Sequence, residues 1–296
     1  MLAFVLIALL SGNNLAVCTG AIISGRMVSK NFGIFITIIG YITGLLLQGN
    51  LLTKGFAALL PLSSSPLIAI ALGISILVFL ISDILRVPQS LSIAFTMALV
   101  GVALASGNSL NVSYLLLILA FWILAPLVTV FLTMILLRYT TRKMLKTRLW
   151  KTLDAVKITL IIVSFLSAVT LGANTIGLLY ASVSAYTSIW IIIGAIVIGS
   201  FLLSAGALRR IGDQIIPIRY LNALVSQALS SVLVEIATLA SLPFSNTQAF
   251  TASLYGVALS YRTKLLLKQT AIVIILAWIA NALLSLVLGY LIVRIF

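Results

Sequence analysis

The chain offers few side chains that could take part in chemistry. It contains no His, one Cys and only four acidic residues among its 296 positions. The absence of His argues against a Ser-His catalytic pair and against a typical metal site. A membrane enzyme would need a nucleophile with a base, or metal ligands, and the absence of His and of paired carboxylates argues against both. We therefore expect no catalytic residue, no metal site and no enzyme.

The remaining polar residues gather in two short motifs, and each motif occurs once in each half of the chain. The first is Ser-Gly-Asn-Asn at 11–14 and Gly-Ala-Asn-Thr at 172–175, where it interrupts a hydrophobic segment. The second is Val-Pro-Gln-Ser-Leu-Ser-Ile-Ala at 87–94 and Leu-Pro-Phe-Ser-Asn-Thr-Gln-Ala at 242–249, where one segment ends and the next begins. A tight turn would explain either motif alone, but the same order in both halves indicates a repeated site.

The first motif suits a cation. Gly frees the backbone from helical geometry, and Asn side chains replace the hydrogen bonds that are lost. The exposed carbonyl and amide oxygens can then coordinate a cation. The residues that we expect to bind or couple a cation here are Asn13, Asn14, Asn174 and Thr175.

The second motif suits an oxyanion. A Pro followed by Ser and Thr is typical of a helix start, with Pro in the first turn. Free N–H groups, hydroxyls and the positive end of the helix dipole bind phosphate or sulfate there without a dedicated charge. The predicted anion-binding residues are Ser90, Ser92, Ser245, Asn246 and Thr247.

Composition places these motifs in a membrane protein. Hydrophobic residues make up 62% of the chain and charged residues 7%, with a mean hydropathy of +1.30, whereas a soluble domain carries about a quarter charged residues. Spans must be helices or a closed barrel, and long apolar runs without alternation exclude the barrel. The sequence predicts an all-α polytopic membrane protein with about ten helical segments. They are 1–24, 32–49, 66–85, 88–107, 114–137, 155–183, 188–206, 220–242, 243–260 and 270–293.

Basic residues indicate the orientation of these segments. The one polar linker, 138–154, is rich in Lys and Arg, and cytoplasmic loops carry the excess of such residues. With this linker inside and every segment crossing, only Lys54 and Arg294 of the 18 basic residues lie outside. Both termini then face outward. The positive-inside rule thus explains the net charge of +14 without nucleic acid as a partner.

The basic cytoplasmic linker at 138–154 separates a first transmembrane repeat at 1–137 from a second at 155–296. Five segments per half is an odd number, so the second half enters the membrane upside down. Inverted repeats with broken helices are typical of secondary transporters, which bind their substrate near the midplane. We therefore expect two inverted-topology repeats with broken helices and helix hairpins.

These motifs resemble those of the inorganic phosphate transporter (PiT) family, which carries Gly-Ala-Asn-Asp early and Pro-Val-Ser-Thr-Thr-His-Ala late in each half. The second half is most similar, at 172–174 and 242–249, and the stretches 211–213 and 215–220 also resemble the family. The resemblance covers nearly the whole chain, which looks like a short and divergent member of the family. It implies sodium- or proton-coupled uptake of phosphate, or of sulfate in some relatives.

The chain departs from the family pattern wherever the resemblance implies an intramembrane acid. The motif Asp falls on Asn14 and Thr175, and a further family Glu falls on Gln227, with a first-half counterpart on Tyr41. Glu235 is the one acid in a span without a basic residue close in sequence, which suggests function, although a distant Arg or the outer interface would also accommodate it. We expect Gln227 and Glu235 to belong to the cation or coupling site. The coupling ion, sodium or proton, stays open, and no cofactor is expected.

The leading prediction is a secondary transporter of inorganic phosphate or a related oxyanion, working by alternating access in the cell (plasma) membrane. A sulfate permease of the same fold and an uncoupled anion channel are the alternatives, since the expected carboxylates are missing. The other predicted partner is the lipid bilayer, and a homodimer is left open.

Overall fold

The computed structural model describes residues 1–60, 65–85, 90–144, 149–204, 220–261 and 265–295, and within these ranges the regular structure is helical. The helices of the first half are α1 (Leu2–Ser24), α2 (Lys30–Leu59), α3 (Ser65–Ile84), α4 (Leu91–Ser106) and α5 (Val112–Met144). Those of the second half are α6 (Leu149–Leu171), the π-helical turn η1 (Gly172–Ile176), α7 (Gly177–Val183), α8 (Ile189–Leu202), α10 (Tyr220–Leu239), α11 (Asn246–Ser260) and α12 (Leu265–Ile295). Each predicted segment contains a helix, so the all-α prediction is confirmed.

Helix lengths show which segments can cross a bilayer alone. Within the described ranges, seven helices are long and apolar enough to do so, counting α6 to α7 as one. Helices α4, α8 and α11 have 16, 14 and 15 residues. At about 1.5 Å per residue they span roughly 21–24 Å, less than the hydrocarbon core of about 30 Å. These three are therefore too short to cross the bilayer as single helices, and for them the crossing stays a prediction.

Helix α11 begins inside the protein rather than at its surface. The preceding residues 242–245 are buried, and the helix starts only after Ser245, whose side chain accepts a hydrogen bond from the Gln248 backbone N–H. The prediction that Pro243 forms the first turn is therefore wrong. Ser245 is the N-cap and satisfies one free N–H of the first turn, so α11 starts at Asn246, three residues beyond the proline. Ser90 caps α4 in the same way through the Ile93 N–H, and Pro88 lies outside the described residues.

The predicted break in the first segment is absent, because α1 is a continuous α-helix through 11–14. Gly12 serves close packing instead, since a Cβ there would come within 2.6 Å of the carbonyl oxygen of Gly199 in α8. In the second half the break takes a mild form, the π-helical turn η1. Such bulges stay within a helix and are frequent at functional sites.

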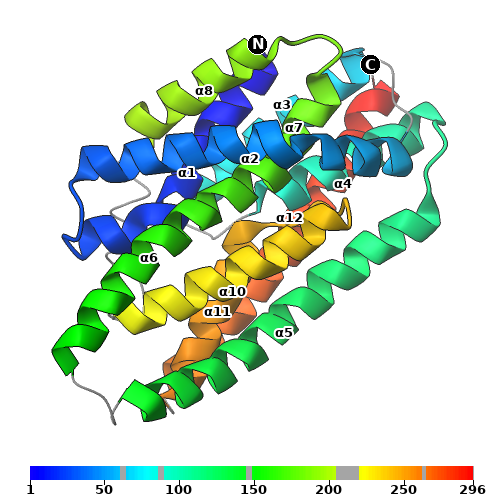
Figure 1. The fold of residues 1–296 in the computed structure, drawn as a ribbon. Coiled ribbons are helices and arrows are strands. Elements are labelled where there is room, and N and C mark those ends of the chain that lie inside the picture. Colours follow the sequence, from blue (N-terminus) through cyan, green and yellow to red (C-terminus); the bar gives the residue numbers. More distant parts are fainter. Residues whose placement is uncertain (61–64, 86–89, 145–148, 205–219, 262–264, 296) are drawn as a thin grey trace.

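Helices of the two halves exchange partners in a reciprocal way. Helix α4 packs against α12 and α11 against α5, while α1 packs against α8 and α2 against α6, η1 and α7. Figure 1 shows both termini at one end of the bundle, opposite the end at which α5 finishes and α6 begins. This arrangement agrees with the expected inverted halves, and the division at 138–154 stays a prediction.

Candidate functional site: a central polar pocket

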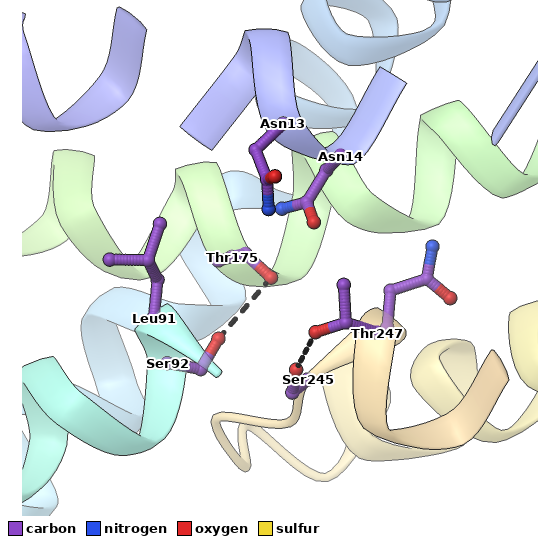
Figure 2. A pocket seen from close by; sticks show the side chains of 8 residues that line it. Asn13, Asn14, Leu91, Ser92, Thr175, Ser245 and Thr247 are labelled. Carbon is purple, nitrogen blue, oxygen red and sulfur yellow. Dashed lines mark hydrogen bonds between the residues drawn. The ribbon is translucent and has the colours of Figure 1, made fainter. Parts of the chain in front are cut away.

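A small pocket lies in the core where both motifs of both halves are expected to meet. We call it the central pocket. Its lining residues are Asn13, Asn14, Leu91, Ser92, Thr175, Ser245, Asn246 and Thr247. Seven of these eight are predicted site residues, drawn from α1, η1, α4 and the start of α11 (Figure 2). None of the eight carries a formal charge.

Two helix N-termini meet at this pocket. Leu91 and Ser92 are the first residues of α4, and Asn246 and Thr247 are the first residues of α11. The first N–H groups of a helix have no partner within the helix, and its N-terminus carries about half a positive charge. The ends of two helices therefore supply about one positive charge to a pocket without a cationic side chain.

Two pairs of hydroxyl groups lie at the pocket, and one of them joins the two halves of the chain. The Ser92 hydroxyl donates to Thr175 Oγ1 at 3.4 Å, joining α4 to η1. The hydroxyls of Ser245 and Thr247 lie 2.7 Å apart. Both pairs appear as dashed lines in Figure 2. Hydroxyls both donate and accept hydrogen bonds, so these groups can turn from one another toward a ligand.

The side chains of Asn13 and Asn14 reach the pocket from α1 (Figure 2). Asn14 is only 7% exposed, and its amide forms no hydrogen bond with a described residue. Buried polar groups in folded proteins are almost always hydrogen-bonded. A buried amide beside a cavity without a partner is therefore a candidate ligand contact.

Two predicted residues support the pocket without lining it. Ser90 is fully buried as the N-cap of α4, and Asn281 of α12 donates to its carbonyl oxygen at 3.0 Å. Asn174 donates to Thr238 Oγ1 and to the Leu242 carbonyl, each at 3.0 Å, and accepts from the Phe244 N–H at 2.9 Å. Asn174 thus fixes the chain between α10 and α11 rather than facing the cavity.

The last two predicted residues lie elsewhere. Gln227 is fully buried and bonds to backbone carbonyls of α1. Glu235 is partly buried on α10, where its Oε1 accepts a hydrogen bond of 2.7 Å from Gln48 Nε2 of α2. Gln48 was not predicted as a site residue, although an isolated Gln in an apolar segment is itself a signal. Neither Gln227 nor Glu235 lines the central pocket.

Sequence reasoning also missed residues that hold the two short helices in place. Trp122 of α5 donates from Nε1 to the Pro243 carbonyl at 2.8 Å, just before α11. Asn281 of α12 does the same for Ser90 before α4. Asn281 is a polar residue in an apolar span, which could have drawn attention to it, whereas nothing local distinguishes Trp122.

The sequence pattern of the phosphate transporter family matches residues 10–289. The chain belongs to this family. It is 27% identical over 300 residues to a protein of Methanocaldococcus jannaschii named "Putative phosphate permease", covering 99% of this chain and 95% of that protein. A solved structure titled "The sodium-dependent phosphate transporter" shares the fold, with a TM-score of 0.82 at 13% identity, over 99% of this chain and 96% of that one.

Membership in the phosphate transporter family has three direct consequences. The chain is a transporter and not an enzyme, as predicted. It is an integral multi-pass membrane protein, in agreement with its apolar helices. The transporter resemblance noted from the two motifs is also confirmed.

Proposed function

We propose that this chain is a secondary transporter of the cell membrane that carries inorganic phosphate by alternating access, with the anion bound in the central pocket. One observation carries the proposal: the N-termini of two short helices, α4 and α11, meet at a pocket lined by Ser, Thr and Asn. Such N-termini bind phosphate groups through free N–H groups and the helix dipole. Family membership supports phosphate as the anion.

The chemistry of the pocket suits transport better than tight storage. A full cationic partner in a dry core would bind an anion strongly and release it slowly, because charges interact more strongly at low dielectric. Helix ends and hydroxyls supply a partial positive charge and several donors instead. The unpartnered Asn14 amide adds a further donor, so a dehydrated oxyanion can be held and then released.

The tightness of the pocket supports alternating access. In this structure the cavity has room for about one water molecule, which is less space than a phosphate ion needs. Binding therefore requires the starts of α4 and α11 to move apart and the two hydroxyl pairs to exchange their mutual bonds for the anion. The reciprocal packing of the two halves supports an inverted repeat, in which one half rocks against the other.

Coupling is proposed to run through a proton at Glu235. An acid within a span is costly and is usually functional, and Glu235 has a hydrogen-bond partner on another helix, Gln48. One turn further along α10, Thr238 accepts a hydrogen bond from Asn174, the neighbour of the pocket residue Thr175. Protonation of Glu235 would therefore remove a negative charge one helical turn away from the Asn174 contacts that hold the start of α11.

Purified protein in liposomes tests this function. We expect labelled phosphate to accumulate against its gradient when an inward proton gradient is imposed, and labelled sulfate to accumulate far less. Sulfate uptake at the same rate would favour the sulfate permease of the same fold. Phosphate flux that only equilibrates, whatever gradient is imposed, would favour the uncoupled channel and overturn alternating access.

A further inference from the structure

The side-chain amide of Gln227 in α10 makes three hydrogen bonds in the core, as many as that of Asn174. Gln227 is fully buried. Its Nε2 donates to the carbonyl oxygens of Cys18 at 2.6 Å and Val17 at 3.0 Å, and its Oε1 accepts from Ser164 Oγ at 3.0 Å. We call these four residues the core amide cluster. It joins α10 to α1 and α6.

Two neighbouring backbone carbonyls of α1 thus converge on one nitrogen in a dry part of the protein. Carbonyl and hydroxyl oxygens are also the ligands that hard cations prefer. Each carbonyl lies within the continuous helix α1 and accepts an N–H of that helix, so its second lone pair is the one that can face a cation or a further N–H donor. Here the donor is the neutral amide of the Gln227 side chain, and each of its two N–H groups has a carbonyl acceptor.

The cluster is linked to the central pocket by a chain of hydrogen bonds. Asn246, which lines the pocket, donates from Nδ2 to Ser167 Oγ at 3.4 Å. Ser167 Oγ donates to Cys18 Sγ at 3.8 Å, and Cys18 also supplies the shorter of the two carbonyl contacts to Gln227. The position of α1 at Cys18 is therefore connected to the start of α11.

A sodium ion does not fit this chain at the cluster. Its oxygens already have N–H or O–H partners, and no carboxylate among them offsets the loss of the ion's hydration. We propose that the Gln227 amide takes the place of a bound sodium ion, so that the central pocket binds phosphate without sodium. This departs from the solved structure whose title names sodium dependence. The phosphate part of the proposal rests on the proposed function, whereas the sodium part does not.

The first test is a sodium titration of the purified wild-type protein at constant ionic strength, with choline as the replacement cation. We expect its unfolding temperature and its phosphate dissociation constant to stay the same within twofold. Sodium that stabilises the protein or strengthens phosphate binding would overturn the proposal. This measurement stands whether or not any variant folds.

The second test is Gln227→Glu, with Gln227→Met as the matched uncharged control. The Glu carboxylate would face two carbonyl oxygens and need a cation between them. We expect sodium, but not choline, to raise the unfolding temperature of this variant and to tighten its phosphate binding about tenfold. The Met variant should be less stable and should not respond to sodium. A Glu variant as indifferent to sodium as the wild type would overturn the proposal.

The two tests separate failure of the inference from failure of the function. If no variant binds phosphate, the proposed function fails, yet the sodium dependence of the unfolding temperature still judges the assignment of Gln227. If phosphate binds but sodium changes neither the unfolding temperature nor the phosphate affinity of the Glu variant, only the assignment of Gln227 fails.

Discussion

The central pocket and the core amide cluster are two polar regions of one protein core, joined through Asn246, Ser167 and Cys18. They differ in how their polar groups are satisfied. In the cluster, Gln227 bonds to groups on two other helices. In the pocket, Asn14 is buried without a hydrogen bond to a described residue, beside a cavity. Paired groups hold helices together, whereas unpaired groups beside a cavity are those that a ligand can satisfy.

The largest expected effect comes from removing two pocket hydroxyls together, as Ser245→Ala with Thr247→Ala. Hydrogen bonds to a charged ligand contribute about 1.5–3 kcal/mol each, so phosphate affinity should fall at least about 100-fold. Because Ser245 also caps α11, stability should fall by about 1 kcal/mol, which is less than the loss in binding free energy. Binding calorimetry and thermal unfolding in detergent measure both quantities.

A matched control for that pair is Thr133→Ala with Ser253→Ala. These hydroxyls lie 2.7 Å apart between α5 and α11, away from the pocket. This control should lower stability and leave phosphate affinity within a few-fold of the wild type. Equal losses of affinity in both pairs would show that α11 packing, rather than the pocket hydroxyls, controls binding.

Glu235→Gln should produce the next largest effect. It keeps the contact with Gln48 but removes the group that can carry a proton. We expect phosphate uptake into liposomes to lose its dependence on a proton gradient, while equilibrium phosphate binding persists because Glu235 lies outside the pocket. Sodium-stimulated uptake that survives this change intact would count against proton coupling.

Gln227→Met tests whether the core amide cluster contributes to stability rather than to phosphate binding. It removes the amide from the carbonyls of Val17 and Cys18 and leaves Ser164 without its acceptor. Losing such buried hydrogen bonds costs about 1–3 kcal/mol of stability, with a much smaller loss of phosphate affinity. Thermal unfolding and phosphate binding are again the measurements. Binding lost at unchanged stability would place Gln227 with the pocket instead.

The last prediction concerns the orientation of the two halves in the membrane, and its substitutions should change phosphate binding and stability least. Single cysteines at Asn108 and Thr147, in a Cys18→Ala background, should react with an impermeant thiol reagent from opposite sides. Position 147 lies in the basic linker, outside the described residues, and Asn108 follows α4. If both positions react from outside, the inverted orientation of the halves is wrong.

The sequence was sufficient to predict the helices and most of the pocket, because both depend on local patterns. Long apolar runs predict spans, whereas the caps at Ser90 and Ser245 were not predicted, because the motif was interpreted with Pro in the first turn. Two equivalent motifs in each half were expected to converge, and Ser92, Thr175 and Ser245 do line one pocket.

What the sequence could not give are contacts between distant segments. Gln227 bonds to carbonyls about 210 residues earlier in the chain, and no spacing rule reveals such a pairing. The continuity of α1 was also missed, because Gly12 looks like a helix breaker until the close approach of Gly199 is seen. The start of α11 was placed too early, since Pro243 and Ser245 are both common at helix starts.

The most direct test of the central claim is to locate a bound oxyanion. A crystal structure of the purified protein with arsenate, whose arsenic atom can be found by anomalous scattering, would do this. We predict arsenic in the central pocket, with the hydroxyls of Ser92, Ser245 and Thr247 within hydrogen-bond distance of arsenate oxygens and with the starts of α4 and α11 further apart. Arsenic bound only at another place, such as the basic cytoplasmic side, would contradict the assignment of the pocket.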